Sequence, residues 1–357
     1  MRKILFLALM ALAIVACNKK IKPSHDKHNL PKEHLSSWKN KDTMSGAVFS
    51  INTVIDYVEA ATDSTSKPYI ATKDRIAVFD MDGTIACERP FSMELFTAYK
   101  LAFGLSPSCN DKQNDLQKAV LDAFGSYLPG TLTSDSLVSL ITMYTNTIEN
   151  NCIPKHKPKN RVLKNQFYKP MIELIEYLQA NDFQVYIVSG SSQQFIWGIV
   201  KNEPTLAKLP PSHIIGSLQK YKSITHLKGK GPEFYLDTAN FFSNVSSHKA
   251  INIYNRIGKK PVLAFGNTVN DFDMFSLTSS NKEYPTLCVL INHDSDKLEE
   301  KYNAFDSSKK VCKNWNQEPY CNENWNHKIF TEIMTEQGWH LANMSECFNH
   351  EAVFINN

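Results

Sequence analysis

The sequence predicts an α/β fold built around a parallel sheet, and two patterns of apolar residues predict it. Four short, almost continuously apolar runs are typical of strands buried on both faces of a parallel sheet; they lie at 75–79, 185–188, 262–265 and 287–291. A helical stripe with the spacing i, i+3, i+4, i+7 precedes the second run, at Met171, Leu174, Ile175 and Leu178. Strands that alternate with helices in this way indicate βαβ units.

A helical insertion interrupts this alternation at residues 90–165. Three helical stripes occur there without a strand-like run among them; they begin at Leu95, Leu116 and Leu137. Beyond residue 306 the chain is rich in Cys, Asn and Trp, with little regular pattern before an amphipathic stretch near 329–334. We therefore expect an α/β core at 43–89 and 166–305, the helical insertion at 90–165 and a Cys-containing C-terminal extension at 306–357.

Composition and charge are those of an ordinary soluble enzyme. Of the 357 residues, 42% are hydrophobic and 21% are charged, which excludes fibrous and low-complexity chains. Lys and Arg number 39 against 36 Asp and Glu, a formal net charge of +3, and there is no long basic run. Nucleic-acid binding depends on concentrated positive charge and is therefore not expected.

The N-terminus predicts export. Arg2 and Lys3 precede an apolar run at 4–16 that is too short to cross a bilayer as a helix but fits a signal peptide over 1–16. The run ends in Ile-Val-Ala-Cys, which resembles the lipobox of bacterial lipoproteins and implies that Cys17 is lipidated and begins the mature chain. The lipid alone would then hold the chain at a membrane, in the periplasm or at the cell surface. A plain signal peptide with an incidental Cys is the alternative.

The polar stretch at 17–42 has almost no apolar periodicity. Its composition predicts a flexible tether between the anchor and the folded part. His25, His28 and His34 lie within it. Polar tethers are rich in such residues, so we expect these imidazoles to be solvated rather than to bind a metal.

Cysteine usage fits an exported protein, in which disulfides persist. Eight Cys minus the lipidated one leaves seven, so one thiol should remain unpaired. Cys288 lies inside the apolar run at 287–291 and is the expected free thiol. Spacing alone does not decide how the others pair, and two candidates are Cys109 with Cys152 and Cys312 with Cys321.

Two carboxylates follow the first predicted strand. Asp80 and Asp82 are two residues apart in the segment Asp-Met-Asp-Gly-Thr at 80–84, so they leave the strand on the same side. In open α/β sheets ligands bind beyond the carboxyl ends of the strands, where this pair would lie. An Asp-Gly hairpin turn is the alternative, but Cys-Glu-Arg-Pro at 87–90 and a helical stripe follow instead of a return strand. The pair is therefore predicted to be catalytic.

Oxygen-rich segments also end the second and third apolar runs. Ser-Gly-Ser at 189–191 offers hydroxyl and backbone N–H groups, which suit phosphate oxygens, and the segment 266–273 is rich in Asn and Asp. Taken alone, either is a common turn sequence. The G-x-S-x-G nucleophile elbow occurs nowhere in the chain, which argues against a serine hydrolase.

Taken together, these motifs and their order resemble the haloacid dehalogenase superfamily of phosphohydrolases. The motifs are DMDGT at 80–84, VSGS at 188–191 and GNTVND at 266–271, with the helical insertion between the first two. The resemblance covers about 70–295 and includes stretches similar to exported bacterial members related to phosphoserine phosphatases. It implies a Rossmann-like core with a helical cap of the C1 type, and Mg²⁺-dependent hydrolysis of a small phosphorylated metabolite.

The resemblance also implies a role for each motif residue. Asp80 would be the nucleophile that forms an aspartyl-phosphate, and Asp82 would be the general acid and base. Mg²⁺ prefers hard oxygen ligands and would be held by Asp80, the main-chain carbonyl of Asp82, Asp271 and Asn267. The phosphate group would be bound by Thr84, Ser189, Gly190 and Lys249.

The phosphate-binding lysine has more than one candidate. Lys228 and Lys230 stand in a Gly-Lys-Gly context, which superficially resembles that of phosphoserine phosphatases. Lys249 lies 266 − 249 = 17 residues before Gly266, which leaves room for one helix and one turn, whereas an apolar run at 234–236 intervenes after the other two. Lys249 is therefore preferred.

Two departures from the family pattern affect these expectations. Asn267 stands where an Asp is common, which keeps an oxygen ligand but removes a negative charge and can change metal affinity or choice. Phosphoserine phosphatases place a Glu near the cap to meet the substrate ammonium. Glu88 and Arg89 occupy this neighbourhood without a clear register, so phosphoserine itself is not expected as the substrate.

Two other functions stay open. A hydrolase of C–halogen bonds would not use the second aspartate, so the presence of Asp82 argues against it. A catalytically silent surface lipoprotein that uses the fold for binding is the other alternative, and its only indications are Asn267 and the Cys-rich C-terminal segment. Uptake of Mg²⁺ at Asp80 and Asp271 would distinguish the enzyme from such a binding module.

Overall fold

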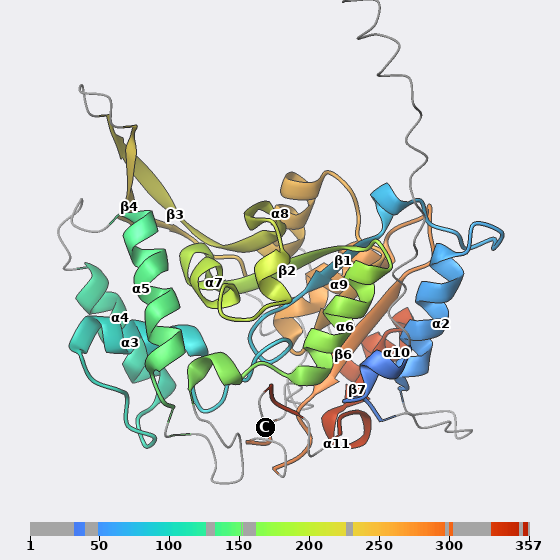
Figure 1. Cartoon of the computed structure of the whole chain (residues 1–357), viewed down its shortest axis with the longest axis horizontal. Helices are drawn as coiled ribbons and strands as arrows, with labels where there is room; N and C mark the ends of the chain where they lie inside the picture. Colours follow the sequence, from blue (N-terminus) through green and yellow to red (C-terminus); the bar gives the residue numbers. More distant parts are fainter. Residues whose placement is uncertain are drawn as a thin grey trace, which may run out of the picture.

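The computed structural model describes residues 32–39, 49–125, 133–150, 152, 162–225, 231–296, 300–302, 330–349 and 353–355. Its centre is a seven-stranded sheet in the order β4-β3-β2-β1-β5-β6-β7 (Figure 1). Neighbouring strands are parallel except for β3 and β4. The strands are β1 (Ile76–Phe79), β2 (Gln184–Ser192), β3 (Ile214–Ile224), β4 (Glu233–Phe242), β5 (Leu263–Gly266), β6 (Leu287–Asn292) and β7 (His340–Asn343). The predicted α/β fold with a parallel sheet is confirmed.

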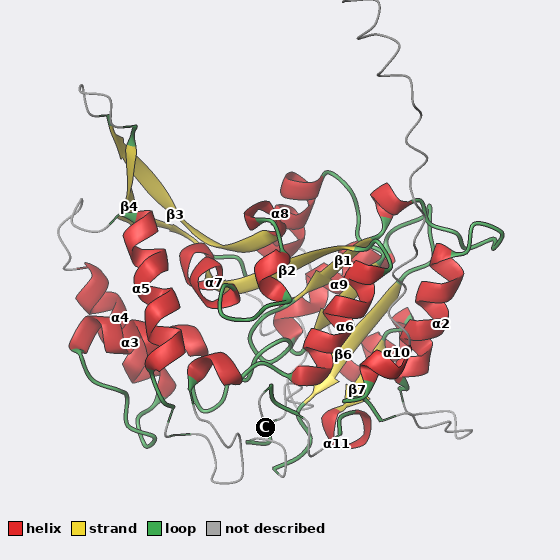
Figure 2. Cartoon of the chain, viewed as in Figure 1, coloured by secondary structure: helices red, strands yellow, loops and turns green. Residues whose placement is uncertain are grey.

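Helices cover both faces of this sheet (Figure 2). They are α2 (Ile51–Thr62), α3 (Met93–Phe103), α4 (Gln113–Gly125), α5 (Ser134–Thr147), α6 (Lys169–Ala180), α7 (Gln193–Val200), α8 (Ser247–Ile257), α9 (Phe272–Ser279), α10 (Phe330–Gln337) and α11 (Met344–Cys347). Ala77 and Phe79 of β1 belong to a core that includes residues of α2, α6 and α7, whereas Ile76 and Val78 belong to a second core with residues of α8, α9 and α10. The strand is therefore apolar at every position because both of its sides are covered.

The helical insertion carries α3, α4 and α5, which lie beside the β3–β4 hairpin at one end of the sheet (Figure 1). Helix α5 packs on α7 so closely that a Cβ at Gly198 would be 2.5 Å from Cγ2 of Ile141. The Ser134 hydroxyl at the start of α5 is 3.4 Å from the Tyr221 hydroxyl of β3. The insertion is thus attached both to a core helix and to the hairpin.

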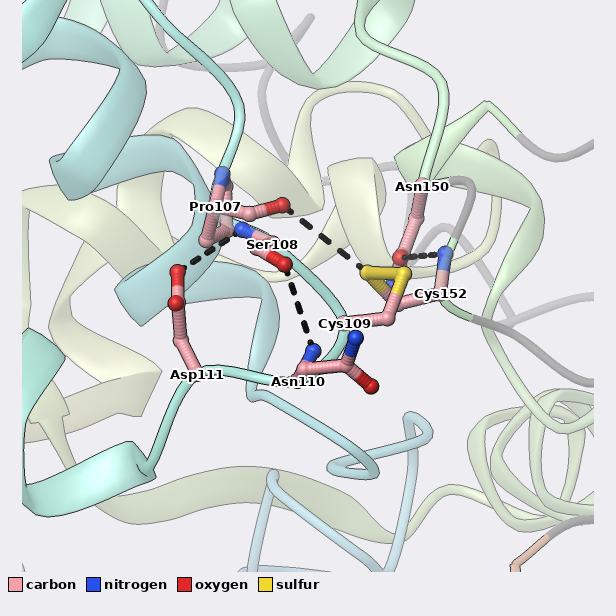
Figure 3. Close-up of a disulfide and its surroundings, with 7 residues drawn as sticks. All are labelled: Pro107, Ser108, Cys109, Asn110, Asp111, Asn150 and Cys152. Carbon is pink, nitrogen blue, oxygen red and sulfur yellow. Dashed lines mark hydrogen bonds between the residues drawn. A yellow bond between two sulfur atoms is a disulfide. The ribbon is translucent and has the colours of Figure 1, made fainter.

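A disulfide between Cys109 and Cys152 closes part of the helical insertion (Figure 3). It links the connection between α3 and α4 to the segment after α5. The Cys152 amide donates to Oδ1 of Asn150 at 3.0 Å, which fixes the turn on one side of the bridge. This candidate pair from the sequence is confirmed.

Replacing Cys109 and Cys152 together by Ser should lower the thermal stability of the helical insertion. The bridge spans a sequence separation of 43, and cross-links over loops of this size restrict the unfolded chain enough to stabilise by about 2–4 kcal/mol. Calorimetry of the oxidised chain and of the double variant should show the variant melting earlier. Dithiothreitol should lower the melting temperature of the wild-type chain to that of the variant. Identical transitions under oxidising conditions would contradict the bridge.

Residues 32–39, expected as part of a flexible tether, are instead packed against α6. Trp38 is buried and donates its indole N–H to the carbonyl oxygen of Pro170 at 2.8 Å. His34, expected to be solvated, has Nε2 2.7 Å from Oε2 of Glu176. One Trp in a polar stretch produces no apolar periodicity, so composition alone predicted a tether here.

The expectation of a single unpaired thiol is wrong. Cys87, Cys288 and Cys347 are all buried thiols in the described part of the chain, and Cys288 is among them as predicted. Each belongs to one of the two hydrophobic cores, where Cys behaves as a small apolar residue.

The sheet continues beyond residue 305, where the sequence placed the end of the core. β7 pairs in parallel with β6, with Val289 opposite His340 and Asn292 opposite Asn343. The strand has only four residues and lies at the edge of the sheet. Edge strands need no continuous apolar run, so this one was missed.

Several expectations concern residues outside the described part of the chain. They are the signal peptide at 1–16, lipidation of Cys17 and the pair Cys312–Cys321. Among the described helices none has the length and apolar character needed to cross a membrane.

Candidate active site

The segment after β1 turns sharply at the carboxyl edge of the sheet. The Asp80 amide donates to the Phe265 carbonyl at 2.9 Å, which continues the pairing of β1 with β5. The amides of residues 84–86 then donate to the Met81 carbonyl at 3.3, 2.9 and 3.0 Å. Gly83 has φ +78°, a left-handed conformation that glycine adopts without strain. The turn holds both predicted carboxylates at the edge of the sheet.

Lys249 links two carboxylates that lie far apart in the sequence. Its Nζ is 2.5 Å from Oδ1 of Asp80 and 2.6 Å from Oδ1 of Asp271. All three side chains are buried. Lys249 comes from the first turn of α8 and Asp271 directly precedes α9. The alternatives Lys228 and Lys230 lie outside the described residues.

The electrostatics of this group are dominated by burial and by mutual contact. Burial raises the pKa of Asp80 well above its usual range and the Asp271 carboxylate adds to this, whereas Lys249 acts in the opposite direction. Burial alone would lower the pKa of Lys249, but Asp271 and Asp80 raise it above the usual lysine value. Lys249 is therefore a fixed positive charge beside Asp80.

Backbone amides hold Asp271 in place. Its Oδ2 accepts from the amides of Asn267 at 3.0 Å and Thr268 at 3.1 Å. The backbone at Gly266 lies so close to the Asp271 side chain that a Cβ at position 266 would be 2.6 Å from Cγ of Asp271. Gly266 is thus required by the approach of this carboxylate. With Oδ2 fixed, Oδ1 is aimed at Lys249.

The end of β2 supplies hydroxyl groups to Asp82. Oδ2 of Asp82 accepts from the Ser191 hydroxyl at 2.6 Å and from the Ser189 hydroxyl at 3.4 Å. Burial raises the pKa of Asp82, and these hydrogen bonds act in the opposite direction. A carboxyl group with a raised pKa holds a proton closer to neutral pH, as a general acid must.

The other two predicted phosphate-binding residues lie beside these groups. Thr84 is buried, and its Oγ1 has no hydrogen-bond partner among the described residues. Gly190 follows Ser189 in β2, and its carbonyl accepts from the Ser217 hydroxyl of β3 at 2.6 Å. An unpartnered buried hydroxyl is available to a ligand.

The sequence missed a fourth carboxylate, Glu94. It lies in the first turn of α3, and both of its oxygens are 3.1 Å from the Ser192 amide. One of them also accepts from the Ser192 hydroxyl. Burial raises the pKa of Glu94, and the Asp82 carboxylate adds to this. Glu94 links the helical insertion to the end of β2, next to Ser191, to which the resemblance assigned no role.

The oxygen atoms at this edge fit a magnesium ion. Oδ1 of Asn267 is buried and has no hydrogen-bond partner among the described residues. It belongs to the same loop as Asp271, and hard oxygen ligands are those Mg²⁺ prefers. No group of three or more His, Cys, Asp or Glu side chains suited to a metal is found in the described part of the chain. A cation here would use amide and main-chain oxygens together with those of Asp80 and Asp271.

The chain thus combines a parallel sheet, carboxylates at the carboxyl edge of that sheet and a helical insertion after β1. The model of the haloacid dehalogenase-like hydrolases matches residues 77–276, and the chain belongs to this family. No curated protein matches it.

The solved structures that resemble this chain have low sequence identity to it. A conserved protein of unknown function from Anaerococcus prevotii is 12% identical, with a TM-score of 0.43 over 70% of this chain and 88% of its own. Cytosolic 5′-nucleotidase IIIB bound to cytidine is 11% identical, with a TM-score of 0.38 over 68% and 78%. A phosphoserine phosphohydrolase-like protein from Francisella tularensis is 16% identical, with a TM-score of 0.30 over 62% and 88%. Similarity at this level does not define an activity for the chain.

Proposed function

We propose that the protein is a Mg²⁺-dependent phosphomonoester hydrolase that acts on a small phosphorylated metabolite through an aspartyl-phosphate. One observation carries the proposal: Lys249 holds the buried Asp80 and Asp271 together at the carboxyl edge of the sheet. The hydroxyl-bonded Asp82 is two residues from Asp80 in the sequence. A nucleophile, a general acid and a fixed positive charge thus lie at the point where open α/β sheets bind ligands.

The reaction divides into two displacements at phosphorus. In the first, a carboxylate oxygen of Asp80 forms a bond to phosphorus as the bond to the leaving oxygen breaks, and Asp82 gives its proton to that oxygen. In the second, Asp82 takes a proton from water, whose oxygen attacks the same phosphorus. The acyl-phosphate bond breaks, which restores the Asp80 carboxylate and releases inorganic phosphate.

The surrounding groups bind the charge that collects on the phosphoryl oxygens. Lys249 keeps Asp80 in position and faces the phosphoryl group with its positive charge. The Ser189 and Thr84 hydroxyls donate to phosphoryl oxygens, as does the backbone at Gly190. Donors that are already in place at such a site supply a large part of the rate enhancement.

The metal ligands would be Asp80, Asp271, Oδ1 of Asn267 and the main-chain carbonyl of Asp82. Bound Mg²⁺ supplies positive charge that offsets the repulsion between the Asp80 carboxylate and a dianionic substrate. The unpartnered amide oxygen of Asn267 supports this assignment.

The same proposal places the protein outside the cytoplasm, held by a lipid on Cys17, with the helical insertion as a cap over the site. The Cys109–Cys152 disulfide supports an oxidising compartment. The contact of Glu94 with Ser192 supports the cap, because it brings the first helix of the insertion to the end of β2. A cap at this position excludes water and selects among substrates.

Removal of metal should abolish the activity. The purified chain should release phosphate from an aryl phosphate in the presence of Mg²⁺, and release should stop in EDTA and return when Mg²⁺ is added back in excess. The physical reason is that Asp80 and the substrate dianion repel each other without the cation. Undiminished release in EDTA would contradict the metal assignment, and absence of release from every member of a phosphometabolite panel would contradict the function.

A further inference from the structure

A cluster of side chains fixes the orientation of the Asn267 amide. Nδ2 of Asn267 is 3.0 Å from Oε1 of Glu88 and 3.0 Å from the Tyr302 hydroxyl. The Tyr302 hydroxyl also hydrogen-bonds to Glu88. A carboxylate oxygen only accepts, so the amide nitrogen must face Glu88 and the amide oxygen must face away. That oxygen, Oδ1, is the buried atom without a partner.

Tyr302 is itself held between two side chains. Its ring stacks on His293, with 4.2 Å between ring centroids and 20° between planes. The Arg89 guanidinium lies 4.4 Å from the centroid of the same ring. Nε2 of His293 is 2.7 Å from the Gly83 carbonyl oxygen. The position of the Tyr302 hydroxyl is therefore set by the turn that follows β1.

Gly83 makes room for this arrangement. A Cβ at position 83 would be 1.9 Å from Nδ2 of Asn267 and 2.6 Å from the Tyr302 hydroxyl. Because no side chain fits there, the amide nitrogen can reach Glu88 and Tyr302 at the same time. The orientation of Asn267 is thus determined by packing as well as by hydrogen bonds.

The orientation of Asn267 also affects the charge near the proposed cation. An Asp at position 267 would bring a negative charge to the cation, and Asn267 does not. Glu88 places a carboxylate one hydrogen bond behind the amide. A carboxylate that accepts from a ligand's N–H strengthens the ligating atom on the other side. Burial raises the pKa of Glu88 and the hydrogen bond from Tyr302 acts in the opposite direction, and a cation bound at Oδ1 of Asn267 would favour the charged form of Glu88 further. The negative charge missing from position 267 would then be present at position 88.

We propose that Glu88 and Tyr302 are positioning residues that hold Asn267 with Oδ1 as a metal ligand, and that Glu88 supplies the negative charge which Asn267 lacks. The inference rests on the metal site of the proposed function. It adds two residues that the family motifs do not include and gives a reason why Asn is tolerated at this position.

Metal affinity tests the inference without any use of activity. Mn²⁺ can replace Mg²⁺ at oxygen sites, and the electron paramagnetic resonance signal of free Mn²⁺ measures its binding to the full chain. Glu88→Gln keeps a hydrogen-bonding side chain but removes the charge, and it should weaken binding about 10- to 100-fold. Tyr302→Phe keeps the stacked ring and should cause a smaller loss. The control Glu203→Gln alters a buried carboxylate that accepts from the Leu206 amide of its own turn and should leave the affinity unchanged.

Relocating the charge gives the sharper test. The double variant Glu88→Gln with Asn267→Asp moves the carboxylate onto the ligand and should bind Mn²⁺ at least as tightly as the wild-type chain. Asn267→Asp alone places two carboxylates against each other. It should therefore increase Mn²⁺ affinity less than the same substitution does in the Glu88→Gln background. Effects of the two substitutions that simply add would overturn the inference, because independent sites show no coupling. Thermal melts followed by circular dichroism show that each variant is folded.

The outcomes separate this inference from the proposed function. Unchanged Mn²⁺ affinity in Glu88→Gln, with binding by the wild-type chain, overturns the inference alone. Absence of Mn²⁺ binding by the wild-type chain overturns both. Coupled effects on Mn²⁺ binding in a chain that releases no phosphate support the inference and overturn only the function.

Discussion

Asp80→Asn should abolish phosphate release and leave the chain folded. An amide does not form the acyl-phosphate, so turnover should fall ~10⁴-fold or more, as for other groups that act as the nucleophile of a catalytic unit. Stability should be kept or increased at neutral pH. Burial raises the pKa of Asp80, so its ionised form opposes folding there, and the neutral amide removes this opposition.

The measurement is phosphate release by a colorimetric assay, with thermal unfolding recorded in parallel. Asp74→Asn is the matched control, because Asp74 lies before β1 at the opposite end of the strand and is bonded to Lys259. The control should keep full turnover. Activity in Asp80→Asn above about one hundredth of the wild-type rate would contradict a nucleophilic role, because an enzyme that has lost its nucleophile keeps a far smaller fraction of its turnover.

Lys249→Met should have the largest effect on stability. The substitution leaves Asp80 and Asp271 buried beside each other without their cation, and removing one partner of a buried pair costs about 3–5 kcal/mol. Phosphate release should fall about 10²- to 10³-fold, because a positioned donor to the phosphoryl oxygens is lost. Added Mg²⁺ should recover part of the stability, since a bound cation again separates the two carboxylates.

Thermal melts of Lys249→Met with and without Mg²⁺ check this expectation. Lys259→Met is the control. Its Nζ is 2.6 Å from Oδ1 of Asp74, but the pair lies at the surface and should contribute less than about 1 kcal/mol. If Lys249→Met has the same melting temperature as the control, the buried cluster does not depend on this lysine.

The sequence predicted the sheet because a strand with two covered faces must be apolar throughout, as β1 is. It also predicted that Asp80, Asp82, Ser189 and Asp271 come together. Each follows or ends a strand, and the carboxyl ends of parallel strands meet at one edge. Lys249 was predicted from its distance to the third motif.

The residues that were missed reach the site through tertiary packing. Glu94 occupies the first turn of a helix, where an acidic residue is usually explained by the helix dipole. Tyr302 lies in an irregular segment after β6, and nothing in its neighbours indicates a contact with Asn267. Their roles depend on how separate segments pack, which periodicity and motif spacing do not report.

Direct capture of the phosphorylated chain tests the central claim. A short reaction with ³²P-labelled aryl phosphate, quenched in acid, should leave a label on the peptide that carries Asp80. The label should be released by hydroxylamine, as acyl phosphates are. A quenched chain without label under conditions of active turnover, or a label on the peptide that carries Ser189, would contradict the account.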